Sequence, residues 1–216
     1  MPIFLFVIIL QIMRSNKNNI IKINSDYINS KIGKIYNKNV LYVGPGDGAY
    51  IKHFNINKYN FIGIEKDYNN YKKFKSLNPG YKIYNFDILN LEKKFLNYFD
   101  VIISFSLVQY FKSSEILEYN KISNLYLKDK NSFCINMSIP NIKKKHAYIL
   151  KRIIEKKYNL KGILFDLVEI LSFHDSRFST EPAYWHNPLK IKDCKINYNS
   201  DVFYRFDYSF KKNFKS

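Results

Sequence analysis

Residues 40–48 constrain the fold of this chain more than any other stretch. They read Val-Leu-Tyr-Val-Gly-Pro-Gly-Asp-Gly, so four apolar residues are followed by glycines at alternate positions. Apolar β-branched residues favour a buried strand, and glycine allows backbone bends and close ligand approach that a Cβ would block. Residues 49–54 are a candidate helix start. A strand, a glycine turn and a helix in this order are typical of a site for a nucleotide-like ligand.

Composition limits both the fold and the partners. A chain of 216 residues with 46% hydrophobic and 18% aromatic residues is long and apolar enough for one domain with its own core. The net charge of +17 would by itself favour nucleic-acid binding. However, only four of the 35 basic residues are Arg, the residue best suited to bidentate contacts with bases and phosphates. Since Asn, Ile and Tyr are also abundant, we attribute the Lys excess to A/T-rich codons and expect a solvated Lys-rich surface.

Cysteine and histidine spacing indicates neither a disulfide framework nor a metal site. The only cysteines are Cys134 and Cys194, and no two of the four histidines form a His-x-x-x-His pair. We therefore expect a reducing, cytoplasmic location and no structural metal.

The N-terminal apolar run over residues 3–13 is too short for a spanning helix, which needs about 20 residues. It also lacks the flanks of a signal peptide. Residues 1–19 are expected to form an apolar extension, and residues 20–216 one domain. We expect this extension to be either a packed element or the product of a start codon chosen too far upstream. A shallow membrane contact is a less favoured alternative.

Apolar runs and helical periodicity alternate along the chain. This alternation predicts an α/β fold: a doubly wound, mostly parallel, Rossmann-like sheet with a C-terminal antiparallel hairpin strand. Ligands bind such sheets at the carboxyl ends of the strands. The expected strands are residues 40–43, 61–64, 82–86, 99–105 and 132–139, with a hairpin over 195–199 and 202–210; the expected helices are residues 20–37, 67–77, 113–127, 146–158 and 163–171.

Two acidic residues follow the second and third expected strands. Glu65 lies 21 residues after Gly44, where a carboxylate can accept hydrogen bonds from both ribose hydroxyls of a nucleoside. Asp87 follows the next strand and can accept from the exocyclic amine of adenine. Together with the glycine turn, these positions predict a nucleoside site.

From about residue 20 to 210 the chain resembles the class I S-adenosylmethionine-dependent methyltransferases. The resemblance rests on residues 40–48 and on Gly-Ile-Glu (63–65), Phe-Asp-Ile-Leu (86–89), Phe-Asp-Val-Ile-Ile-Ser (99–104) and Asn-Met-Ser-Ile-Pro-Asn (136–141). It implies S-adenosylmethionine as cofactor, with the methionine part on the glycine loop, the ribose on Glu65, the adenine on Asp87 and the sulfonium beside Ser104. The implied cofactor residues are Gly44, Gly46, Asp47, Gly48, Glu65, Asp87, Ile88 and Ser104.

One position departs from the family. Many members carry an acidic residue two positions before the first glycine, where this chain has Tyr42. The contact of that acid with the methionine end is therefore lost or made elsewhere.

Other ligand classes fit parts of the same pattern. Gly44, Gly46, Ala49 and Glu65 also match the dinucleotide fingerprint, but no Tyr-x-x-x-Lys falls in the helix after the fifth expected strand. Residues 104–110 lack the paired acids of aminopropyltransferases and the Asn/Asp-Pro-Pro-Tyr signature of exocyclic-amine DNA methyltransferases. A non-catalytic binding module with the same fold is a further alternative.

Residues 173–188 concentrate unusual chemistry, with two of the four His, two of the six Pro and the only Trp. We expect a lid in which His174, beside Asp175, or His186 is the base, and Tyr184 and Trp185 stack on the acceptor; in the alternative, Trp185 fills the core. Further acceptor-side candidates are Gln109 and Tyr110.

The expected activity is methyl transfer to a small-molecule acceptor. The alternatives are an RNA or protein methyltransferase, or a non-catalytic cofactor-binding or nucleic-acid-binding module.

Overall fold

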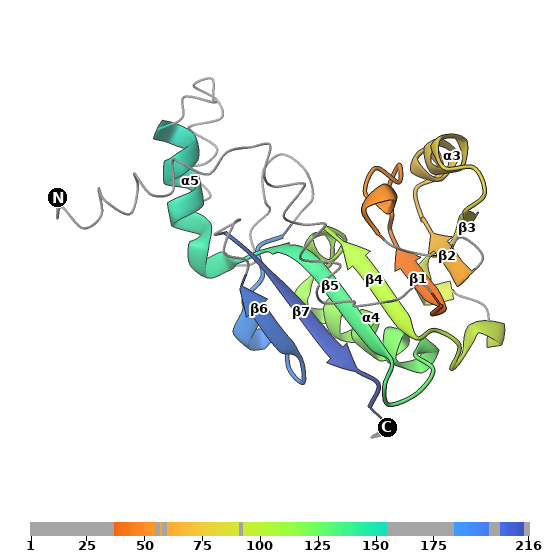
Figure 1. Ribbon diagram of the computed structural model, residues 1–216. Helices are drawn as coiled ribbons and strands as arrows, with labels where there is room; N and C mark the ends of the chain where they lie inside the picture. The colour runs from red at the N-terminus through yellow and green to blue at the C-terminus, as the bar shows by residue number, and fades with distance from the viewer. Residues whose placement is uncertain are drawn as a thin grey trace.

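The computed structural model describes residues 37–54, 57, 60–90, 93–154, 184–198 and 204–213. These residues build a seven-stranded sheet in the order β3-β2-β1-β4-β5-β7-β6 (Figure 1). Strands β1 to β5 are parallel, whereas β7 is antiparallel to both β5 and β6. The predicted doubly wound sheet with a C-terminal antiparallel hairpin is confirmed. The strands are β1 (Val40–Val43), β2 (Phe61–Ile64), β3 (Lys82–Tyr84), β4 (Val101–Phe105), β5 (Phe133–Pro140), β6 (Lys195–Tyr198) and β7 (Arg205–Lys211).

Strand β1 lies at the centre of the parallel part of the sheet. Val40 is in register with Phe61 of β2 on one side and with Val101 of β4 on the other. All four β1 residues are buried, as a parallel strand covered on both faces requires. The chain runs from β1 outward to β2 and β3 and then returns to β4, so the strand order reverses at β1. This reversal is where doubly wound sheets leave room for a ligand.

Helices cover opposite faces of this sheet. Helix α3 (Tyr68–Leu77) begins at Asp67, whose carboxylate accepts a hydrogen bond from the Asn70 N–H, and buries Phe74 on the face of Val40 and Tyr42. Helix α4 (Ser113–Tyr126) buries Ile116 and Tyr119, among others, on the face of Leu41 and Val43. Helix α5 (Lys145–Ile154) follows β5, beyond the short turn η6 (Ile142–Lys144).

The structure corrects several boundaries. The expected helix start at 49–54 is only the short 3₁₀ turn η1 (Ile51–His53), which no side chain caps. Strands β3 and β4 are shorter than predicted, and α5 is described only as far as Ile154. The helix expected over 20–37 falls outside the described residues except for Asn37, and the helix expected over 163–171 and the extension over 1–19 fall outside them entirely. Among the helices described, none is long and apolar enough to cross a bilayer.

The core beneath α4 contains ionisable side chains that burial keeps protonated. Burial raises the pKa of the Cys134 thiol to about 12 and the pKa values of Tyr119 and Tyr208 well above the usual range. Tyr208 still donates a hydrogen bond to Oδ1 of Asn120 at 2.8 Å. In the unfolded chain the pKa values of these side chains are much lower, about 8.5 for Cys and about 10 for Tyr.

We therefore expect alkaline destabilisation. Above pH ~8.5 the unfolded state binds fewer protons than the native state, so the free energy of unfolding falls as pH rises. Below pH ~8.5 both states hold these protons, so the groups contribute nothing to the pH dependence of the free energy of unfolding. Urea unfolding at pH 7.5, 8.5, 9.5 and 10.5 measures the effect. Cys134→Ala should reduce the earliest part of the fall, to which Cys194 also contributes because burial raises its pKa to about 12. A free energy of unfolding that stays constant to pH 10.5 would contradict this expectation.

Candidate functional site

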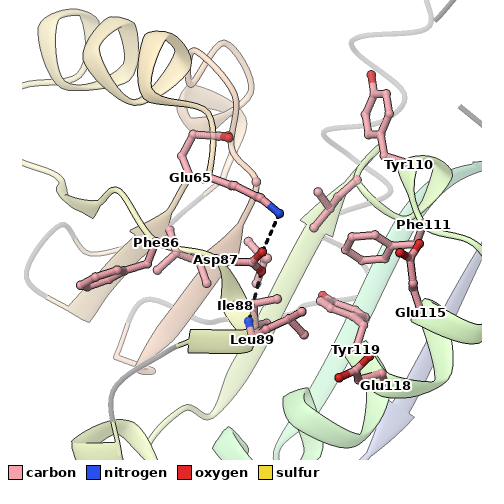
Figure 2. Close-up of a pocket in the computed structure, with 15 residues that line it drawn as sticks. Glu65, Phe86, Asp87, Ile88, Leu89, Tyr110, Phe111, Glu115, Glu118 and Tyr119 are labelled. Atoms are coloured by element: carbon pink, nitrogen blue, oxygen red, sulfur yellow. Dashed lines mark hydrogen bonds and ion pairs between the residues drawn. The ribbon is translucent and has the colours of Figure 1, made fainter. Parts of the chain in front are cut away.

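Two adjoining cavities open at the carboxyl ends of β1, β2 and β4. Their volumes are about 350 Å³ and 700 Å³, within the range of small-molecule sites. Together they form the strand-end groove, and both are lined by Gly44, Glu65, Lys66, Leu107 and Tyr110. The smaller cavity extends toward α4 and is drawn in Figure 2. The larger one extends over the glycine turn toward the start of α3.

The three glycines of the turn have different roles. All have positive φ angles, 64° at Gly44, 60° at Gly46 and 82° at Gly48, which side chains rarely tolerate. A Cβ at Gly44 would lie 2.7 Å from Leu107, and one at Gly48 would lie 2.3 Å from the Asn78 amide. A Cβ at Gly46 would meet no atom within 4 Å. Gly44 and Gly48 therefore allow tight packing, while Gly46 presents bare backbone to the groove.

Glu65 connects the glycine turn to the start of α3. Its Oε2 accepts a hydrogen bond from the Gly46 N–H and its Oε1 one from the Asp67 N–H, both at 2.9 Å. The side chain is only 7% exposed and lines both cavities. Each carboxylate oxygen can accept a second hydrogen bond. A buried carboxylate held in this way suits a ligand that brings hydroxyl donors.

Asp87 lies after β3, in the wall of the smaller cavity. Its Oδ2 forms an ion pair with Lys66 Nζ at 2.8 Å, and its Oδ1 accepts from the Leu89 N–H at 3.2 Å (Figure 2). The hydrogen bond to Asp87 raises the pKa of Lys66. The Lys66 side chain is 78% exposed, so solvent screens this pair and a ligand can compete for it. Beside Asp87, buried Ile88 adds apolar surface that an aromatic ring could cover.

Comparison with known proteins identifies the fold. No protein-family model and no curated protein matches the sequence. Among solved structures, magnesium protoporphyrin IX methyltransferase from Synechocystis PCC 6803 with bound S-adenosylhomocysteine matches over 89% of this chain and 82% of its own, with a TM-score of 0.56 and 12% identity. An S-adenosylmethionine-dependent methyltransferase from Clostridium acetobutylicum matches over 87% and 89%, with a TM-score of 0.57 and 14% identity. This chain has the class I S-adenosylmethionine-dependent methyltransferase fold.

The match is partial for some larger methyltransferases. Against coclaurine N-methyltransferase it spans 56% of this chain and only 37% of the other, with a TM-score of 0.45. The similarity to the Synechocystis and Clostridium structures, at 12% and 14% identity, concerns the fold alone.

Within this methyltransferase fold, Ser104 does not take its predicted place. Its side chain is fully buried, donates a hydrogen bond to Oδ1 of Asn136 at 2.6 Å, and lines neither cavity. Successive strand residues face opposite sides of a sheet, and Ser104 shares the α4 face with Ile102. The groove is instead lined by the next residues, Phe105, Ser106 and Leu107. The sequence predicted the end of β4 correctly at residue 105, but it did not show which face of the sheet Ser104 occupies.

Of the acceptor-side candidates, Tyr110 alone lines the strand-end groove. It is 44% exposed and borders both cavities. Gln109 is buried, and its Oε1 accepts from Arg205 Nη1 at 3.3 Å. The Gln109 carbonyl accepts from the Tyr184 N–H at 2.6 Å. Gln109 and Tyr184 thus join the loop after β4 to the segment before β6, and neither lines the groove.

The predicted lid lies partly outside the described residues. Residues 173–183, His174 included, are not described, and His174 stays a prediction. Trp185 is 1% exposed and packs edge-on against Tyr148, with ring centroids 5.6 Å apart. The Trp185 side chain therefore belongs to the core, which is the alternative role considered for it.

His186 also differs from its predicted role. Its N–H donates to the Pro140 carbonyl and its own carbonyl accepts from the Ile142 N–H, both at 2.9 Å. The side chain is 2% exposed and lines a third cavity of about 230 Å³, between α4 and residues 186–192. It lines neither cavity of the groove. His186 therefore does not lie where a base of the groove would be needed, contrary to its predicted role.

Several groove residues escaped the sequence reasoning. Asp47, which was predicted, borders the larger cavity and accepts from the Ala49 N–H. The missed residues include two tyrosines, one lysine and three acids from the turn after β1, the segment from the end of β2 into α3, and helix α4. These are Tyr50, Lys66, Asp67, Tyr68, Glu115 and Glu118.

Proposed function

We propose that this protein is an S-adenosylmethionine-dependent methyltransferase that acts on a small-molecule acceptor in the cytoplasm. The observation that carries the proposal is Glu65, a buried carboxylate at the carboxyl end of β2. It is fixed by the Gly46 and Asp67 N–H groups and exposed to both cavities of the groove. This is where a doubly wound sheet holds the ribose of a nucleoside ligand.

The residues present fit the proposed cofactor. Glu65 would accept hydrogen bonds from the ribose hydroxyls. Asp87 would accept from the adenine amine, sharing or displacing the Lys66 ammonium, with Ile88 against the ring. The bare backbone at Gly46 would leave room for the methionine part. The cofactor, when bound, supplies an activated methyl group on sulfur.

The protein's own contribution is to orient the acceptor and exclude water. Holding two reactants in line can supply about 7–11 kcal/mol of the barrier. Phe105, the last residue of β4, and Tyr110, in the loop after β4, can form the wall against which an acceptor is held. Burial raises the pKa of Tyr42 well above its usual range, so this groove residue keeps its proton at neutral pH and is unsuited to act as a base.

A small-molecule acceptor is favoured by the size of the groove. Its cavities of about 350 and 700 Å³ suit a cofactor together with a small acceptor. Magnesium protoporphyrin IX, named for the Synechocystis protein, is also a small molecule. The alternatives, a methyltransferase for RNA or protein and a non-catalytic module, have no comparable support from the groove.

Ligand-induced stabilisation tests the cofactor. A ligand that binds only the native state at a hundred times its Kd stabilises that state by about 2.7 kcal/mol. For a chain of this size each kcal/mol raises the Tm by roughly 2–4 °C. We therefore expect S-adenosylhomocysteine to raise the Tm by roughly 5–10 °C at saturation, with no shift for NAD. The proposal fails if millimolar S-adenosylhomocysteine leaves the Tm unchanged, or if NAD alone raises it.

A further inference from the structure

The strand-end groove carries a charge opposite to that of the chain. The whole chain has 35 Lys and Arg against 18 Asp and Glu, so a random surface patch would hold about twice as many cations as carboxylates. Among the described residues, the two cavities instead place six carboxylates beside a single cation, Lys66. The six acidic residues are Asp47, Glu65, Asp67, Asp87, Glu115 and Glu118.

Within the part of the chain that the structure describes, most of this negative charge has no cation beside it. Lys66 already pairs with Asp87, and in the described part of the chain no ion pair involves the other five carboxylates. Glu65, Asp67 and Glu115 accept hydrogen bonds from backbone N–H groups. Such bonds hold the carboxylates in place but do not neutralise their negative charge. A cleft with one sign of charge and low-dielectric walls concentrates the field and attracts ligands of the opposite sign.

Aromatic rings in the larger cavity indicate the same kind of ligand independently. Tyr50 and Phe105 lie with ring centroids 4.4 Å apart. Both line this cavity together with Tyr68 and Tyr110, which are 54% and 44% exposed. Aromatic faces attract ammonium groups through the ring quadrupole, by about 0.5–1 kcal/mol at exposed sites. Anionic groups gain nothing from such a face.

We infer that the acceptor of the proposed methyl transfer is a cationic amine, and that phosphate-bearing acceptors such as RNA are excluded from the groove. The inference rests on the proposed function and names its substrate class. The ammonium first releases a proton to water. The nitrogen lone pair then forms the bond to the methyl carbon while the carbon–sulfur bond breaks and its electron pair goes to sulfur. The positive charge passes from the sulfonium, which becomes a neutral thioether, to the methylated ammonium.

Three probes of matched shape test the charge preference. They are 2-phenylethylamine, neutral 2-phenylethanol and anionic 3-phenylpropionate. Each is titrated by calorimetry into the full-length chain, with and without saturating S-adenosylhomocysteine. The amine should bind at least tenfold more tightly than the anion, with the alcohol between them. Equal or tighter binding of the anion would overturn the inference, as would transfer of labelled methyl groups to total RNA.

A charge-removing variant locates the effect. Asp67→Asn removes one negative charge from the groove and keeps a side chain that caps α3 equally well. Asp129→Asn is the matched control, since Asp129 accepts a similar local hydrogen bond from the Asn131 N–H and lies outside the groove. Asp67→Asn should weaken 2-phenylethylamine binding roughly two- to fivefold at low salt and less at 1 M salt. Equal effects of the two variants would overturn the inference.

The two proposals fail in different ways. Absence of S-adenosylhomocysteine binding contradicts the proposed cofactor whatever the probes do. Normal S-adenosylhomocysteine binding without a preference for the amine contradicts only the acceptor class.

Discussion

Glu65→Ala is expected to abolish most of the affinity for S-adenosylhomocysteine. The change removes the buried carboxylate proposed to accept both ribose hydroxyls, and hydrogen bonds to a charged group contribute roughly 1.5–3 kcal/mol each. Because 1.4 kcal/mol corresponds to a factor of ten in affinity, we expect Kd to rise at least tenfold and by more than a hundredfold if both bonds are lost. Isothermal titration of the purified variant measures this.

Two controls separate the contact from the fold. Glu65→Gln keeps one acceptor oxygen and should lie between wild type and the alanine variant. Glu118→Ala removes another carboxylate of the same groove, one that is exposed, and should change Kd far less. Circular dichroism checks that the alanine variant folds, since the Gly46 and Asp67 N–H groups lose their acceptor. An unchanged Kd for folded Glu65→Ala would show that the ribose is held elsewhere.

Trp185→Ala is expected to have the largest effect on stability. The indole is 1% exposed and packs against Tyr148, and truncating a buried Trp to Ala costs about 3–5 kcal/mol. Urea unfolding measures the loss in the free energy of unfolding. Leu189→Ala, four residues along the same segment and 70% exposed, should change that free energy by less than about 0.5 kcal/mol.

The same variant tests the lid hypothesis. If Trp185 belongs to the core, the folded fraction of Trp185→Ala should bind S-adenosylhomocysteine with nearly wild-type affinity. Unchanged stability with weakened binding of acceptor probes would instead place the indole in the lid that the sequence suggested.

The strand and turn pattern of the first half of the domain could be predicted from sequence. Parallel strands are buried on both faces, so their sequences are continuously apolar, as at residues 40–43 and 61–64. Both strands occur where predicted. The positions of the three glycines and of Glu65 could be predicted from the sequence for a related reason. Positive φ angles and a strand-end carboxylate are local requirements, so the residue types that meet them stand out along the chain.

The side of the sheet on which a residue lies depends on the tertiary structure. Ser104 and Phe105 are neighbours in β4, yet one is buried under α4 and the other lines the groove. Residues 184–186 contain the side chains expected of an acceptor lid, but the pairing of His186 with the end of β5 turns Trp185 into the core.

The sequence by itself therefore determined the sheet, its hairpin and the positions of the glycine turn and the strand-end acids. The tertiary structure alone decided the Lys66–Asp87 pair, the buried state of His186 and the gathering of six carboxylates around one groove. Periodicity and turn chemistry act between residues that are close in the chain. Charge and burial at the groove instead depend on segments as distant as residues 47 and 118, which only the folded chain brings together.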